Sequence, residues 1–295
     1  MRASKRQAAE PADATRVDEG GGARRRSLGV LRHRDFRLLW AGQAVSWTGS
    51  QMQLVAINWH VYLLAKPYGE KYAAAALGAV GLVRVVPIVI CSLAGGVAAD
   101  ALDRRRLIVA TQFVMIASAA ALSLVTWRGL TTVWPIYLLT ALSSAATAFE
   151  NPARQALLPS LVPERELANA VSFGFIAFQT ATVAGPLAAG LLLASAGPAS
   201  VYAINAVSFL AVIAAVVAMR ADTRAATGED AASPVGLDSL VEGLRFVRRS
   251  PVIVQSMALD FVATFFASAT ALLPIFAADI LRVGPRGLGV LAASA

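Results

Sequence analysis

Long apolar stretches are the feature that most restricts the folds open to this chain. Seven of them follow one another, at residues 36–65, 73–99, 107–127, 133–150, 168–195, 199–219 and 252–276. A helix that crosses a bilayer needs about 20 mostly apolar residues, and these runs are too long and too continuous for membrane strands. The sequence therefore predicts an all-α membrane protein. An eighth apolar stretch starts near Gly287 and stops at Ala295, so we expect the chain to end inside the membrane.

The composition supports a membrane protein and argues against several other classes. Hydrophobic residues make up 57% of the chain and charged residues 15%, against about 25% charged residues in soluble domains. The net charge of +8 comes from arginines between apolar stretches, so we expect these arginines to set topology and not to bind nucleic acid. One cysteine and two histidines are too few for a common metal site, and the sequence has no phosphate-binding loop motif. We expect no cofactor, no metal and no enzymatic activity.

Lysines and arginines predict the orientation, because they gather on the cytoplasmic side of membrane helices. With the N-terminus inside, the inner segments carry 20 of these residues and the outer segments carry 5. The outer residues are Lys66, Lys71, Arg128, Arg282 and Arg286. Residues 1–27 have no apolar core, so we interpret them as a disordered cytoplasmic tail and not as a signal peptide.

Residues 220–250 form the longest linker. They carry one apolar stripe at helical spacing, made of Leu237, Leu240, Val241, Leu244 and Val247. Because Arg245, Arg248 and Arg249 lie beside it, the stripe predicts an amphipathic helix on the cytoplasmic membrane surface.

A weak internal repeat indicates how the chain is divided. "LRHRDF" and "LRFVRR" lie 213 residues apart, and "ALGAVGL" and "GLGVLAA" lie 211 residues apart. Together with the long linker, the repeat indicates two six-helix halves. Residues 28–219 would form the first half and residues 251–295 the start of the second, so we expect the chain to be truncated at its C-terminus.

A dense charge cluster, "GGVAADALDRRRL" from Gly95 to Leu107, separates the second and third apolar stretches. Its Gly96, Asp100, Arg105 and Arg106 resemble the pattern G-x-x-x-D-[RK]-x-G-x-[RK]-[RK] of the major facilitator superfamily, in the same loop. Ala101 and Asp103 depart from that pattern.

Three further stretches carry a narrower resemblance. "LRHRDFRLLWAGQAVSWTGSQMQ", "FENPARQALLPSLVP" and "ANAVSF…GPLAAGLL" are similar to the bacterial exporters related to the enterobactin exporter. The resemblance covers roughly residues 28–295. It implies a multi-pass protein of the bacterial plasma membrane with a six-helix N-terminal bundle, followed by the first one or two helices of the C-terminal bundle.

The resemblance also implies a cytoplasmic latch between the two halves. Asp100 and the basic residues Arg104, Arg105 and Arg106 would form it, weakened by the missing charge at Ala101. We expect Glu150 to join this gate by pairing with Arg154 or with the arginine cluster. The alternative is that Glu150 is a simple surface carboxylate.

Polar residues in two apolar stretches predict a substrate cavity, since buried amides need partners or water. The candidates are Gln43, Ser46, Ser50, Gln53, Asn58, His60, Thr140 and Ser144. Those on residues 36–65 fall on one face, except Asn58, which lies on a second stripe nearby, and we expect them to line a central aqueous cavity, as the resemblance implies. The alternatives are hydrogen bonds between helices, close packing of the small hydroxyl residues, and a packing role for His60.

Two charges lie deeper in the predicted membrane, at Arg84 and Asp260. They would pair across the halves, or Asp260 would carry a coupling proton, or each has a local structural role. "GPLAAG" begins at Gly185 and Pro186, which predict a kinked helix. A glycine–proline motif at this place in exporters of the superfamily favours export.

The sequence therefore predicts a secondary transporter that exports a small organic molecule, siderophore or drug-like, against protons by alternating access. An importer of the same fold is one alternative. A non-transporting membrane sensor or assembly protein is the other. The expected partners are the lipid bilayer, the substrate and protons.

Overall fold

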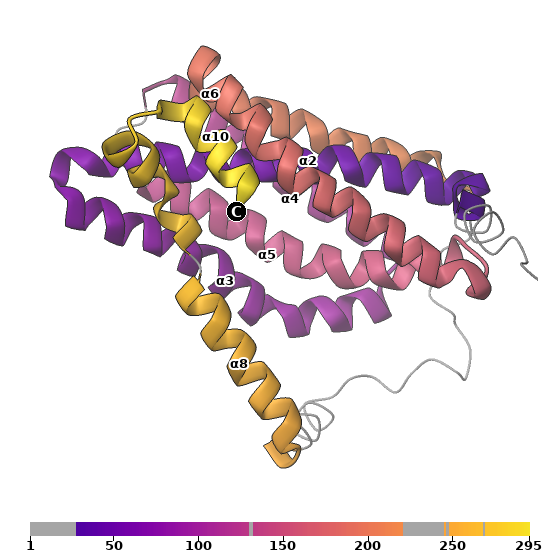
Figure 1. The fold of residues 1–295 in the computed structure, drawn as a ribbon. Helices are drawn as coiled ribbons and strands as arrows, with labels where there is room; N and C mark the ends of the chain where they lie inside the picture. Colours follow the sequence, from indigo (N-terminus) through magenta and orange to yellow (C-terminus); the bar gives the residue numbers. More distant parts are fainter. Residues whose placement is uncertain (1–27, 130–131, 221–244, 246–247, 268) are drawn as a thin grey trace, which may run out of the picture.

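The computed structural model describes residues 28–129, 132–220, 245, 248–267 and 269–295 (Figure 1). Within these ranges, the side chains of residues 28, 100, 260–267 and 269 are not described. The predicted tail at residues 1–27 and the apolar stripe of the linker lie outside the described residues.

The described chain is helical throughout. The long helices are α2 (Arg34–Ala65), α3 (Glu70–Ala101), α4 (Arg104–Trp127), α5 (Trp134–Leu157), α6 (Leu167–Ala218), α8 (Pro251–Ala267) and α10 (Gly284–Ser294). The short turns are η1 (Leu28–Arg32), η2 (Lys66–Tyr68), η3 (Leu158–Ser160), η4 (Glu164–Glu166), η5 (Ala269–Leu272), α9 (Leu273–Ile275) and the π-turn η6 (Phe276–Ile280). These helices confirm the predicted all-α class.

Helix α6 contains two of the predicted spans. Its backbone leaves the helical region at Gly197, with φ 73° and ψ −179°, directly before Pro198. Only glycine adopts such a positive φ without strain, and proline removes a backbone donor at the same point. Residues 167–196 and 198–218 are therefore two helical segments, as the gap between residues 195 and 199 predicts.

Three described helical stretches are long and apolar enough to cross a membrane. They are Glu70–Ala99, Arg104–Trp127 and Glu164–Ala218. Helix α2 has 32 residues, which is long enough to span a bilayer, but polar residues along it and along α5 lower their hydropathy.

Helices α2 to α6 lie side by side in one bundle (Figure 1). Helix α2 packs along α6 and also touches α3, α3 packs on α5, and α4 contacts both α5 and α6. One apolar core, with Tyr62 and Tyr202, lies toward the end of the bundle where α2 stops at Ala65. Another, with Phe36 and Ile108, lies toward the Arg34 end. We call these the Ala65 end and the Arg34 end.

The segment after the linker differs from its prediction in one respect. The expected continuous helix over residues 252–276 is wrong: α8 stops at Ala267, and short turns follow. Pro274 lies in the first turn of α9, where its missing N–H and its ring would interrupt a helix over residues 252–276, although α8 already ends seven residues before it. Figure 1 shows α8 pointing away from the bundle.

Helix α10 returns to the bundle and packs on α6. A Cβ atom on Gly190 would lie 2.9 Å from the Cα of Gly289, so the two backbones touch where they cross. Small residues permit such crossings between membrane helices. This contact fixes the place of the predicted eighth stretch, whose helix begins at Gly284, three residues before the predicted start near Gly287.

Candidate functional site: a polar cavity and two polar networks

A small cavity of about 100 Å³ lies between the two apolar cores. Four of the predicted cavity residues line it: Ser50, Gln53, Thr140 and Ser144. The other polar lining residues are Arg84, Ser143, Thr147 and Asn205. The cavity therefore brings together polar side chains from α2, α3, α5 and α6, and Met115 of α4 also lines it.

The remaining predicted cavity residues lie elsewhere. Gln43 belongs to a network nearer the Arg34 end, and Ser46 is buried. His60 is buried, with Nδ1 3.3 Å from the Tyr202 hydroxyl oxygen, and Asn58 is half-buried. The periodicity of α2 gives the face that each side chain occupies, but the stripe runs along the whole helix and only its middle meets the cavity.

Asn205 is a cavity residue that sequence reasoning missed. Its Nδ2 donates to Gln53 Oε1 at 2.7 Å, and its Oδ1 accepts from the Ser208 hydroxyl at 3.0 Å. A Cβ on Gly49 would lie 2.5 Å from Asn205 Oδ1, so glycine lets α2 approach this amide closely. A single asparagine in an otherwise apolar stretch was the available signal.

A buried polar network joins α2 and α5. Gln43 Nε2 donates to Glu150 Oε1 at 3.3 Å, and Arg154 Nη1 donates to Gln43 Oε1 at 3.1 Å. Arg154 Nη1 lies 3.8 Å from Glu150 Oε1, and the guanidinium stacks 4.9 Å from the ring centre of Trp47. Of the two partners expected for Glu150, the structure places Arg154 beside it. Glu150 is 6% exposed, so it is not a surface carboxylate.

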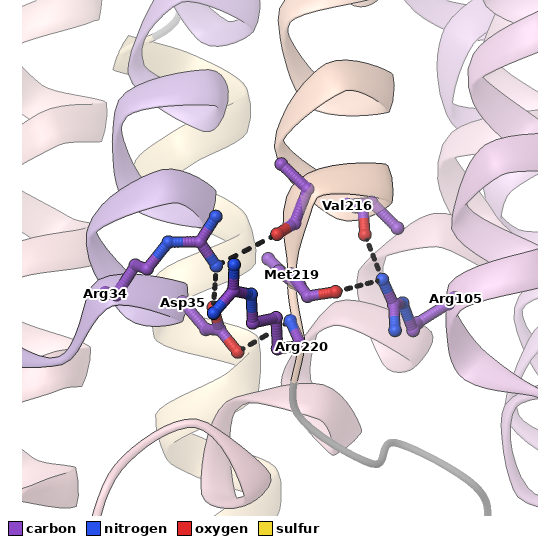
Figure 2. A network of polar contacts seen from close by, with 7 residues as sticks. Arg34, Asp35, Arg105, Val216, Met219 and Arg220 are labelled. Atoms are coloured by element: carbon purple, nitrogen blue, oxygen red, sulfur yellow. Dashed lines mark hydrogen bonds and ion pairs between the residues drawn. The ribbon is translucent and has the colours of Figure 1, made fainter.

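The arginine cluster at the start of α4 binds the ends of neighbouring helices (Figure 2). Arg105 Nη2 donates to the carbonyls of Val216 and Met219, and Arg104 Nη1 donates to Ala156 O at 3.0 Å. The last carbonyls of a helix lack intrahelical partners, and cations are favourable there. The cluster thus holds the ends of α5 and α6 together at the Arg34 end.

Helix α2 joins the same end of α6 (Figure 2). Arg34 Nη1 donates to Ala218 O at 3.0 Å and lies 3.2 Å from Asp35 Oδ1, and Asp35 Oδ2 accepts the Arg220 N–H at 3.0 Å.

Asp103, which departs from the superfamily pattern, caps α4. Its side chain accepts the backbone N–H groups of Arg105 at 2.9 Å and Arg106 at 3.4 Å. Aspartate is among the best N-cap residues. Arg106 lies 3.8 Å from Asp103, and its own side chain is 90% exposed.

Replacing Arg105 with alanine should lower the free energy of unfolding by about 2 kcal/mol, because charge-assisted bonds to the α6 carbonyls are lost. The same change at Arg106 should have an effect within about 0.5 kcal/mol, since its side chain is exposed. Denaturant unfolding of the purified variants would compare them. Equal losses at the two positions would contradict the capping role.

The other predicted residues are Gly96, Gly185, Pro186, Asp100 and Asp260. A Cβ on Gly96 would meet no atom within 4 Å. A Cβ on Gly185 would lie 2.6 Å from the Gln51 Cβ, so α6 touches α2 there, while Pro186 keeps helical backbone angles. The side chains of Asp100 and Asp260 lie outside the described residues.

Another polar contact, which the sequence did not predict, lies at the Ala65 end. Asp279 accepts a hydrogen bond from Lys66 Nζ at 2.5 Å and another from the Tyr62 hydroxyl at 2.7 Å. The Lys66 ammonium and then the Tyr62 hydroxyl hold the pKa of Asp279 below its ordinary value. This contact ties the turn before α10 to the end of α2.

Known proteins place this architecture in a family. A family model described as transmembrane secretion effector, of the major facilitator superfamily, matches residues 26–295. The chain belongs to this family. This confirms the resemblance stated from the motifs, and the family's members are transporters rather than enzymes.

The chain is similar to three named transport proteins. Macrolide efflux protein A of Streptococcus pyogenes is 29% identical over 183 residues, 62% of this chain and 42% of the relative. The multidrug efflux pump Tap of Mycolicibacterium fortuitum is 26% identical over 262 residues, 86% of this chain and 61% of the relative. The staphyloferrin A transporter of Staphylococcus aureus is 31% identical over 149 residues, 50% of this chain and 36% of the relative. The chain thus spans between 36% and 61% of these relatives' lengths.

Proposed function

We propose that this secretion effector exports a small organic molecule across the bacterial plasma membrane by alternating access. The observation that carries the proposal is the polar cavity, which lies midway between two apolar cores of a membrane bundle. Polar groups at that depth are costly unless they serve a pathway or pair with one another. Two of the named relatives are efflux proteins, which supports export.

The Arg34 end is proposed to face the cytoplasm. The excess of lysine and arginine in the segments that reach this end supports that orientation. The arginines at the start of α4 would then have two tasks. Arg104 and Arg105 hold the ends of α5 and α6. Arg106, which is exposed and lies 3.8 Å from Asp103, is the proposed partner of Asp100 in the latch that opens and closes the cytoplasmic side.

Protons are the proposed coupling ion. Asp260 is the proposed carrier, because its sequence position puts an ionisable group inside a predicted apolar stretch. Glu150 is proposed as part of the gate, since its contacts with Gln43 and Arg154 link α2 to α5 on the side of the cavity that faces the Arg34 end. A change in this pairing would reach two helices that line the cavity.

Dye efflux tests the proposal. Cells that express the complete open reading frame would be loaded with a fluorescent hydrophobic dye, with and without an uncoupler that collapses the proton gradient. We expect efflux that the uncoupler stops and that Asp100→Asn reduces by roughly tenfold or more. Efflux that continues without a proton gradient would contradict proton coupling, and uptake in place of efflux would indicate an importer.

A further inference from the structure

Arg84 is the charged residue of the cavity. It lies near the middle of α3, on the helix face that also carries Leu77 and Val80, and its side chain lines the cavity and is exposed. The other residues that line the cavity are all neutral. The cavity therefore presents a guanidinium to whatever enters it, at a depth where an arginine is expensive to place.

No described carboxylate compensates Arg84. Among the described residues, the structure records no hydrogen bond or ion pair of Arg84. Glu150, which follows Thr147 by one helical turn, is already held by Gln43 and Arg154. Because Glu150 and Arg154 offset each other, the described part of this region keeps one uncompensated positive charge.

The neutral lining supplies hydrogen-bond donors beside that charge. The Thr140 hydroxyl is buried without a hydrogen-bond partner among the described residues, in a side chain that is 5% exposed. Gln53 accepts a bond from Asn205 through Oε1, which leaves its Nε2 group to donate elsewhere. Such donors complement an anion that Arg84 attracts, since buried polar groups need partners.

The size of the cavity limits what can enter. Its volume of about 100 Å³ is well below the roughly 300–1,000 Å³ of sites that enclose a whole drug-sized molecule. It has room for one small functional group. The planar fork of arginine matches the two oxygens of a carboxylate.

We propose that the Arg84 cavity binds a carboxylate group of the exported molecule, so that this transporter selects organic acids. The inference rests on the proposed function and adds the class of substrate. The alternative, predicted from the sequence, is that Arg84 pairs with Asp260 and binds no group of the substrate.

Three fluorescent probes that differ in one charge would test the inference. Dansylglycine carries a carboxylate, dansylglycinamide is neutral, and dansylethylenediamine is a cation. Each would be titrated against the full chain in phosphatidylcholine nanodiscs, with energy transfer from tryptophan to the dansyl group as the signal. Empty nanodiscs give the background.

We expect the chain to bind the acid roughly tenfold more tightly than the amide, and the amine most weakly. Arg84→Gln should remove the preference for the acid and leave binding of the amide within about twofold. Arg84→Lys should keep part of the preference, because the charge remains and the fork is lost. Arg128→Gln, at the exposed end of α4, is the control and should bind as the unchanged chain does.

Thr140→Val provides a second test that does not remove a charge. It should weaken binding of the acid about threefold or more and binding of the amide less, because the carboxylate is the stronger acceptor of the Thr140 hydroxyl. Equal binding of acid and amide by the unchanged chain, or a preference that survives Arg84→Gln, would overturn the inference and leave the proposed function intact. Failure of all three probes to bind would overturn the small-molecule site and the proposed function with it.

Discussion

Replacing Gly95 with alanine should destabilise the chain, whereas the same change at Gly96 should not. A Cβ on Gly95 would lie 2.3 Å from the carbonyl oxygen of Ala148 and 2.9 Å from its carbon. These are backbone atoms, so they cannot swing aside as a flexible side chain would, and α3 must move away from α5. Overpacking of this kind costs about 1–3 kcal/mol.

Gly96 provides the matched control, because a Cβ there would meet nothing within 4 Å. Alanine also favours a helix over glycine by up to about 1 kcal/mol. Gly96→Ala should therefore be neutral or slightly stabilising in thermal unfolding of the chain in nanodiscs, and Gly95→Ala should unfold several degrees lower. A larger loss at Gly96 than at Gly95 would contradict the packing described for α3 and α5.

Removing the Glu150 carboxylate should also have a large effect. In Glu150→Ala, the half-buried Arg154 guanidinium loses its counter-ion and Gln43 Nε2 loses its acceptor. Breaking a buried ion pair by removing one partner costs about 3 kcal/mol. We expect a loss of that size in the free energy of unfolding.

A double-mutant cycle separates the pair from the individual side chains. Because Glu150→Ala/Arg154→Ala removes both charges, its loss should be smaller than the sum of the two single losses by about 1 kcal/mol or more. Glu164→Ala, at an exposed carboxylate outside the network, should change the free energy of unfolding by less than about 0.5 kcal/mol. Strict additivity at Glu150 and Arg154 would show that their contact contributes nothing.

The sequence predicts the helices well because their signal is local. Length and apolar content mark each span, and the Gly197–Pro198 pair that separates the two segments of α6 is visible in the sequence. The exception is the stretch over residues 252–276, where the apolar sequence continues although α8 ends at Ala267.

The site was only partly predictable, because its contacts join distant parts of the chain. The stripe on α2 gives a direction but not a depth, so Ser50 and Gln53 reach the cavity while Gln43 reaches Glu150. The basic residues of the cluster are visible in the sequence, yet the binding of Arg105 to the end of α6 depends on how two helix ends meet. The same holds for Asp279, which lies 217 residues from its partner Tyr62.

The central claim is that solvent reaches a polar cavity in the middle of the membrane bundle. Thiol labelling tests it directly, because Cys91 is the single cysteine and Cys91→Ser provides a cysteine-free background. On that background, Ser50→Cys on the cavity wall would be compared with Ala119→Cys, a fully buried position on α4, with a membrane-impermeant reagent on either side. We expect Ser50→Cys to react from at least one side and Ala119→Cys to react from neither. If Ser50→Cys is as unreactive as Ala119→Cys from both sides, the cavity is closed to solvent and the transport account is wrong.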